Sequence, residues 1–227
     1  DYMMHTYPLM QTVFGKIVMC LNPRHSSLLF LERIIFKRKH YRQITCISEQ
    51  CKKEIVNHYK VSPHTIEIIY NGVNISIFTP KNRTTYRDTV RATYGIATDE
   101  VLLLFVGSGF KRKGLKYVIE ALSLINKSQK TKLLVVGKGT IREHQRLARK
   151  NGVLDKLIFA GVCKHIQEIY AGGDIFVFPS EYDAFGTACL EAMASGLPVI
   201  ASKSSGVSEI IAQGQDGFVI HHPIDAR

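Results

Sequence analysis

The stretch EYDAFGTACLEAMASGLPVIAS, Glu181–Ser202, decides the fold. It follows DIFVFPS at residues 174–180, a short apolar run that predicts a buried parallel strand. Within the stretch, helix-forming residues begin near Gly186 and stop at Gly196, and Pro198–Ala201 predicts the next strand. The order strand, loop, helix, strand is typical of open parallel sheets, which bind ligands where their strands end.

The same alternation extends to both sides of this stretch. Further strands are predicted at residues 101–107, 132–137, 156–161 and 217–220, with helices at 113–126, 141–150, 165–171 and 207–212. Such regular alternation predicts a Rossmann-like, doubly wound parallel sheet of the α/β class. Earlier in the chain, a strand at residues 43–48, a helix at 49–60 capped by Ser48, and a segment at 65–78 with a short strand and a turn at Asn71-Gly72 predict a separate unit. The polar residues 79–98 predict a linker and a short helix ending at Gly95.

The loop after residue 180 has the chemistry of a sugar-nucleotide site. Backbone N–H groups of Phe185, Gly186 and Thr187 at a helix start can bind an anion, and Gly186 permits close approach. Asp183 and Glu191 flank seven residues; carboxylates repel phosphate but accept hydrogen bonds from sugar hydroxyls. The pattern predicts ribose on one carboxylate and a hexose near the other. The alternative is an acidic helix start that only favours the helix dipole.

A second motif, GSGFKRKG at residues 107–114, directly follows a predicted strand. Gly107 permits a tight turn, and Lys111, Arg112 and Lys113 supply three positive charges that suit a diphosphate. The motif lacks the Gly-Lys-Ser/Thr ending of a Walker loop and the full dinucleotide fingerprint. The alternative interpretation is a solvated basic loop.

Composition limits the class of protein. The chain has 227 residues, 45% hydrophobic and 22% charged, which is typical of a globular protein with a sizeable core. No apolar run is long enough to span a membrane. Five cysteines without metal spacing suit a reducing cytosol, so we expect a cytoplasmic protein. The net charge of +11 indicates an anionic partner: a nucleotide, a phosphorylated acceptor, an anionic lipid or a nucleic acid.

Residues 1–43 mix aromatic and basic side chains, and Leu28 to Ile35 predict a helix with one apolar face. One interpretation is a patch that binds an anionic membrane surface, which would make the protein peripheral at the inner membrane. The alternative is a helix packed on its own sheet, with a solvated basic face.

The acidic stretch resembles the signature of the retaining glycosyltransferases with the GT-B fold, in which two acidic residues flank seven others. The resemblance implies that Glu191 holds the ribose hydroxyls and that Asp183 lies beside the transferred sugar. The family usually has Glu at the first position, and Asp183 is shorter by about 1.5 Å. The amides of Phe185, Gly186 and Thr187 are implied to meet the donor.

The same resemblance assigns the basic motif. Arg112 and Lys113 are similar to the pair that neutralises the donor diphosphate, and the tight turn at Gly107 precedes them. The family holds the base largely through backbone groups after the third strand, which implies Val162 here. Such enzymes need no metal and no other cofactor, because these cations replace it.

Over nearly its whole length the chain resembles the lipopolysaccharide core glucosyltransferases that add glucose to a heptose. The segments that carry this resemblance are NPRHSSLLFLERIIF, ITCISEQCKKEIVNHY and VGSGFKRKGL. The resemblance implies that residues 1–75 are the end of an incomplete acceptor-side domain and that 76–227 bind the nucleotide sugar. The implied reaction moves a hexose, glucose from UDP-glucose, with retention onto a glycan or lipid-linked acceptor. Two alternatives stay open: a sugar-nucleotide epimerase of the same architecture, and a basic nucleic-acid-binding protein. The carboxylates of the loop would repel phosphate, so we expect no nucleic-acid partner.

Overall fold

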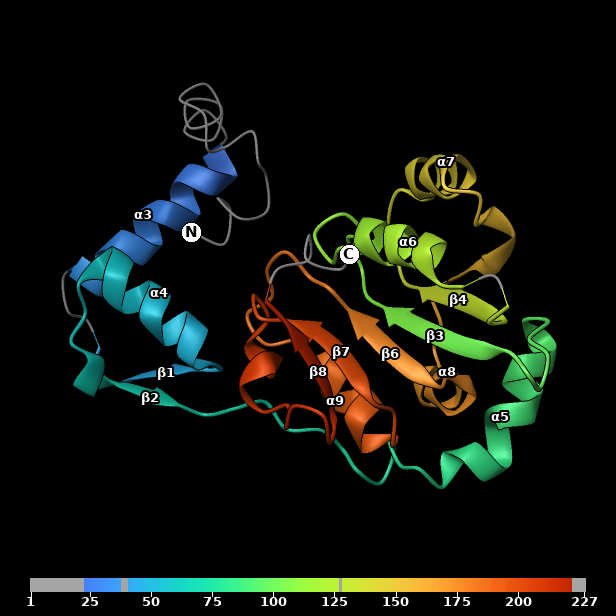
Figure 1. The fold of residues 1–227 in the computed structure, drawn as a ribbon. Coiled ribbons are helices and arrows are strands. Elements are labelled where there is room, and N and C mark those ends of the chain that lie inside the picture. The colour runs from blue at the N-terminus through green and yellow to red at the C-terminus, as the bar shows by residue number, and fades with distance from the viewer. Residues whose placement is uncertain (1–22, 38–40, 127, 222–227) are drawn as a thin grey trace. The chain divides into compact units, whose positions relative to one another are not determined.

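The structure, a computed structural model, describes residues 23–37, 41–126 and 128–221 (Figure 1). Most of the predicted membrane-binding segment 1–43, including residues 1–22, therefore lies outside the described residues. The chain divides into two compact units, Asp1–Tyr70 and Asn71–Arg227. This boundary lies near the predicted domain boundary at residue 75; the assignment of the first unit to an acceptor-side domain stays a prediction.

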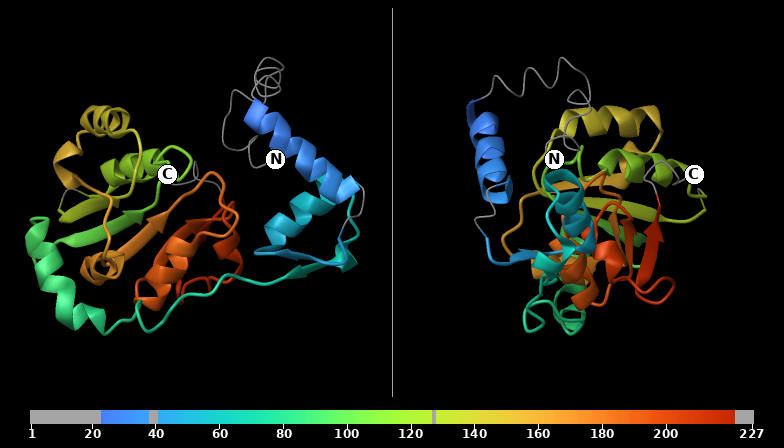
Figure 2. Two further views of the ribbon diagram at one scale, coloured as in Figure 1. Left: turned by 180° about the vertical axis from the view of Figure 1, so that it is seen from behind. Right: turned by 90° about the vertical axis from the view of Figure 1, so that its left-hand side faces the viewer.

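The first unit pairs two short parallel strands beneath two helices. Its elements are α3 (Pro23–Lys37), β1 (Ile44–Cys46), α4 (Glu49–Tyr59), a 3-10 turn (Pro63–Thr65) and β2 (Ile66–Ile68). Ser48 caps α4, as predicted: its Oγ accepts a hydrogen bond from the backbone N–H of Cys51 at 3.1 Å. α3 packs beside α4 (Figure 2), where Phe36 stacks on Tyr59 with ring centroids 4.3 Å apart. The hydroxyl of Tyr59 donates to Glu32 of α3 at 2.5 Å.

The second unit is built on a six-stranded parallel sheet. Its strands are β3 (Val101–Val106), β4 (Thr131–Val136), β5 (Leu157–Gly161), β6 (Ile175–Phe178), β7 (Val199–Ser202) and β8 (Gly217–Ile220). They lie in the order β5-β4-β3-β6-β7-β8, which is 3-2-1-4-5-6 when the strands are counted within this sheet. That is the doubly wound Rossmann order, and its direction reverses between β3 and β6. The predicted α/β class and doubly wound sheet are confirmed.

Helices cover both faces of this sheet (Figures 1 and 2). They are α5 (Asn82–Thr93), α6 (Leu115–Leu124), α7 (Ile141–Lys150), α8 (Ile166–Gly172) and α9 (Thr187–Ala194). Alternate residues of β3 face opposite layers: Leu102 and Leu104 pack with α5, α8 and α9, whereas Leu103 and Phe105 pack with α6 and α7. Because both faces are buried, the strands are continuous apolar runs, which is why the sequence predicted them.

Two predicted helices differ from the structure. α6 begins at Leu115 rather than residue 113, because Gly114 adopts a left-handed φ of 77°. The predicted helix at 207–212 is wrong: the chain forms a 3-10 turn at Gly206–Glu209. The turn is tied to the preceding loop, since the N–H of Val207 donates to the carbonyl of Phe185 at 2.6 Å.

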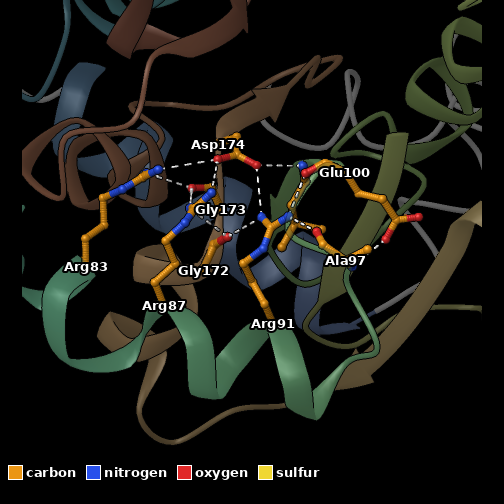
Figure 3. A network of polar contacts seen from close by, with 9 residues as sticks. Arg83, Arg87, Arg91, Ala97, Glu100, Gly172, Gly173 and Asp174 are labelled. Atoms are coloured by element: carbon orange, nitrogen blue, oxygen red, sulfur yellow. Dashed lines mark hydrogen bonds and ion pairs between the residues drawn. The ribbon is translucent and has the colours of Figure 1, made fainter. Parts of the chain in front are cut away.

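Three arginines fasten α5 to the end of α8 (Figure 3). Arg83, Arg87 and Arg91 lie at i, i+4 and i+8 and contact Asp174 at 3.4, 2.6 and 3.1 Å. They also donate to the carbonyls of Gly172 and Gly173, which end α8. We call these three arginines and Asp174 the arginine clasp; the clasp fixes the position of α8 against the sheet.

Candidate functional site

The candidate site lies where the strand order reverses, at the carboxyl ends of β3 and β6. The loop after β3 carries the basic motif 107–114, and the loop after β6 carries the acidic stretch from Glu181. The two loops are joined directly: the N–H of Glu181 donates to the carbonyl of Arg112 at 2.9 Å. The hydroxyl of Ser180 donates to the same carbonyl at 3.2 Å. The fold therefore brings together two motifs that lie 70 residues apart in the chain.

The predicted catalytic residues form one ionic cluster. Lys113 donates through Nζ to Oδ2 of Asp183, and a guanidinium nitrogen of Arg112 lies 3.5 Å from the same oxygen. Arg112 also donates to the carbonyl of Tyr182 at 2.8 Å, and the Lys113 ammonium lies 4.7 Å from the ring centre of Phe178. All three charged side chains are only 13–20% exposed. Two cations and one carboxylate therefore lie together, largely buried, at this end of the strands.

The pKa of Lys113 depends on the neighbouring carboxylate of Asp183. Burial lowers the pKa of Lys113 below its usual value, and the positive charge of Arg112 lowers it further. The Asp183 carboxylate acts in the opposite direction and favours the charged ammonium. A second anion at this position would stabilise the cations in the same way.

The loop from Asp183 to Gly186 is hydrogen-bonded to the loop after β7. The N–H of Asp183 donates to the carbonyl of Ser204 at 3.1 Å, and Ser205 donates through Oγ to the carbonyl of Phe185 at 3.1 Å. Gly186 has a φ of 96°, and a Cβ there would lie 2.9 Å from Ser205 Oγ. Only glycine fits this backbone, which turns the chain directly into α9.

The backbone amides at the start of α9 were predicted to bind an anion. The N–H of Phe185 donates to Oδ1 of Asp183 at 3.3 Å, so in this structure it bonds to the carboxylate. Gly186 and Thr187 form the start of the helix, where N–H groups have no carbonyl four residues earlier within the helix. These two amides lie at the positive end of the helix dipole, on the same loop as the ionic cluster.

Glu191 lies in the second turn of α9, and Tyr170 of α8 contacts it. The Tyr170 hydroxyl donates to Oε2 of Glu191 at 2.8 Å. Burial raises the pKa of Glu191, while this hydrogen bond opposes the shift. The carboxylate is thus half-buried and held from one side.

Glycines shape the neighbouring edge of the sheet. The N–H of Gly137 donates to the carbonyl of Gly161 at 2.7 Å, and the N–H of Gly107 donates to that of Val136 at 2.9 Å. A Cβ on Gly137 would lie 2.0 Å from the carbonyl oxygen of Gly107, so the turns after β3 and β4 are in close contact. Val162, just beyond β5, is 63% exposed. The residue whose backbone is predicted to meet a base is therefore exposed to solvent, and that role stays a prediction.

Sequence reasoning missed three features near the site. Tyr170 gave no signal, since one tyrosine in a short helix is usually a core residue. The i, i+4, i+8 spacing of the clasp arginines could have been found, but the segment was interpreted as linker and short helix. Glu181 is bound by Lys116 at 3.0 Å and Tyr117 at 3.1 Å, apart from the ionic cluster.

Among the described residues, no three His, Cys, Asp or Glu side chains are grouped to hold a metal ion.

The strand order and the loops at its switch point place the second unit in the class of doubly wound domains that bind ligands at this edge. Comparison with known proteins narrows the class. The family described as Glycosyl transferases group 1 matches residues 86–227, and Glycosyltransferase Family 4 matches residues 4–77. The chain belongs to the group 1 glycosyltransferases.

Individual relatives agree with this assignment. An uncharacterized glycosyltransferase of Methanocaldococcus jannaschii, MJ1607, is 31% identical over 79% of this chain and 47% of that protein. The lipopolysaccharide glucosyltransferase WaaG of Escherichia coli K12 is 30% identical over 89% of this chain and 55% of that protein. The crystal structure of WaaG, described as a glycosyltransferase involved in lipopolysaccharide biosynthesis, superposes with a TM-score of 0.80 at 29% identity. This match covers 89% of this chain and 55% of that structure.

These matches confirm the predicted resemblance and the GT-B fold. The chain spans about half the length of the curated relatives it matches. It therefore corresponds to part of their fold.

Proposed function

We propose that this chain is the donor-binding part of a glycosyltransferase that moves a hexose, glucose from UDP-glucose, with retention. The proposed acceptor is a glycan or lipid-linked sugar such as the lipopolysaccharide core. The observation that carries the proposal is the buried cluster of Arg112, Lys113 and Asp183 at the switch point, beside the start of α9. Family membership and the similarity to WaaG support the same reaction class.

Each predicted residue has a role in this proposal. Arg112 and Lys113 stabilise the charge that develops on the leaving diphosphate as the bond to the sugar breaks. Asp183 pairs with these cations before the donor binds and then lies beside the transferred hexose. Glu191 accepts hydrogen bonds from the ribose, and the exposed backbone at Val162 meets the base. Since two protein cations face the diphosphate, the proposed reaction needs no metal ion.

The donor amides complete the proposed site. Gly186 and Thr187 bring N–H groups to the start of α9, where the helix dipole favours an anion. The N–H of Phe185 can join them when Asp183 turns toward the sugar. The tight turn at Gly107 allows the diphosphate to approach the backbone closely.

A membrane surface is the proposed second partner. On α3 the described apolar side chains that face solvent are 47–64% exposed: Leu28, Phe30, Leu31 and Ile35. None of the helices within the described ranges is long and apolar enough to cross a bilayer. A helix that exposes apolar side chains and has basic neighbours in the sequence suits the surface of an anionic bilayer, at the inner membrane in a cytoplasmic protein. Sedimentation with anionic vesicles tests this: Leu31→Glu should reduce binding, and equal binding of neutral vesicles would contradict it.

The donor site is tested by calorimetric titration of this chain with UDP, GDP and a short DNA. We expect UDP to bind and Glu191→Ala to weaken it at least about tenfold, since a hydrogen bond to a charged group is lost. Glu120→Ala is the matched control, because Glu120 is exposed on α6. Binding of GDP alone would change the proposed donor. Binding of DNA with neither nucleotide would refute the glycosyltransferase proposal.

The epimerase alternative differs in one measurable property. An epimerase converts its nucleotide sugar without any acceptor, whereas a transferase needs an acceptor hydroxyl to replace the diphosphate at the anomeric carbon. Incubation with UDP-glucose alone, followed by separation of the sugar nucleotides, distinguishes them. Formation of an isomeric UDP-sugar would favour the epimerase.

A further inference from the structure

The hydroxyl of Tyr170 contacts α9 at two points. It lies 2.8 Å from Oε2 of Glu191 and 3.1 Å from the carbonyl oxygen of Ala188. Ala188 and Glu191 are three residues apart, so they lie on one face of α9. One side chain from α8 therefore contacts both the first turn of α9, next to the proposed diphosphate amides, and the proposed ribose carboxylate.

Tyr170 is held firmly in its own layer. Its side chain is fully buried, and its ring centre lies 5.8 Å from the ring centres of both Phe78 and Phe176. Two residues later, α8 ends at Gly172, whose carbonyl accepts from two arginines of the clasp. The hydroxyl is therefore a fixed point, and the carboxylate must adopt the orientation that this point imposes.

The pKa values of Tyr170 and Glu191 determine which of the two donates the hydrogen bond between them. Burial raises the pKa of Tyr170 well above its usual value, and the nearby charge of Glu191 raises it further. The phenol therefore keeps its proton and acts as the donor. Its hydrogen bond favours the ionised form of Glu191, which is the form with the greater capacity to accept further hydrogen bonds.

We propose that Tyr170 is a positioning residue for nucleotide recognition: it holds Oε2 of Glu191 and directs the other carboxylate oxygen toward the ribose hydroxyls. This inference rests on the proposed function, and it makes a narrower claim about it. The hydroxyl of Tyr170 contributes to binding only when the ligand carries ribose hydroxyls. It also makes the site selective for ribonucleoside diphosphates over their deoxy forms.

The test compares UDP with 2′,3′-dideoxy-UDP by calorimetry on the chain and on Tyr170→Phe, which keeps the ring. We expect Tyr170→Phe to bind UDP about tenfold more weakly, the usual scale for a hydrogen bond to a charged group. Its affinity for dideoxy-UDP should equal that of the unmodified chain. Tyr86→Phe is the control, because Tyr86 packs against the same core from α5 and leaves Glu191 untouched.

The possible results distinguish the positioning role of Tyr170 from the ribose contact of Glu191 on which it depends. A preference for UDP over dideoxy-UDP that survives unchanged in Tyr170→Phe would overturn the inference and leave the ribose role of Glu191 standing. Equal losses for both ligands would mean that Tyr170 only supports the fold of α9. An unmodified chain that binds both ligands equally tightly would refute the ribose contact itself, and the positioning role with it. Because each result is a ratio of affinities, a partly destabilised variant remains informative.

Discussion

Asp174→Asn tests the arginine clasp, which holds the α8 end of the site. The carboxylate accepts hydrogen bonds from Arg87 and Arg91 (Figure 3). It also accepts one from the N–H of Leu102 at 2.8 Å. Arg91 is the most buried partner, with a side chain 5% exposed. An asparagine keeps the volume but removes the charge, and its amide group would place N–H donors against donors.

The expected loss in the free energy of unfolding comes from the arginine charges that no longer face a carboxylate. Removing one partner of a buried ion pair typically costs about 3–5 kcal/mol. We expect the lower end, about 3 kcal/mol, because Asp174 is 22% exposed and Arg91 keeps carbonyl partners at Glu100 and Gly172. For a domain of this size that loss corresponds to a decrease of about 6–12 °C in the melting temperature.

The assay is thermal and urea unfolding followed by far-UV circular dichroism. Asp99→Asn is the matched control, because Asp99 pairs with Lys130 at 2.5 Å on the exposed surface. Exposed pairs contribute little, so this control should unfold almost like the unmodified chain. If Asp174→Asn melts within error of Asp99→Asn, the clasp does not stabilise the second unit and the reasoning is refuted.

Two further predictions concern charge. Lys113→Met should weaken UDP binding at least about tenfold in calorimetry, because the change removes a buried cation that is proposed to face the diphosphate. The same change at Lys111, which is exposed on the same loop, should have little effect, and equal losses would contradict a specific role. The second prediction is a pH dependence. Burial acts to raise the pKa of Asp174, but the N–H of Leu102 and the charges of Arg87 and Arg91 outweigh it, so the pKa is lowered. A lowered folded pKa contributes stability above the unfolded value of about 3.9 that is lost as pH falls through the folded value. The difference in unfolding free energy between the chain and Asp174→Asn should therefore shrink below about pH 4; a constant difference down to about pH 2 would argue against it.

Much of the fold was predictable because its signals are local. The helix at Ile141–Lys150 and the strand at Gly217–Ile220 have the predicted bounds. Each is bounded by turn residues, such as Asn151 and Gly152 after the helix. The helix expected at 207–212 failed for the opposite reason, since hydrogen bonds to residues 183 and 185 shorten it to a 3-10 turn. Local propensity could not include contacts made some 20 residues away.

The contacts that position the site could not be predicted from the local sequence. Asp174 lies 83–91 residues from the arginines that bind it, and Tyr170 lies 21 residues from Glu191. Nothing in the local pattern indicates either partner, because only the order of the strands brings α5, α8 and α9 onto one face.

The ionic cluster shows the same limit at the centre of the site. The sequence indicated that Arg112 and Lys113 would face an anion and that Asp183 would avoid one. It did not indicate that, with β3 beside β6, the carboxylate itself would be the anion that the cations face. Burial lowers the pKa of Lys113 and Asp183 opposes that shift, so the carboxylate favours the charged form of the buried ammonium. The motifs thus predicted which residues belong to the candidate site, and the strand order determined which of them contact one another.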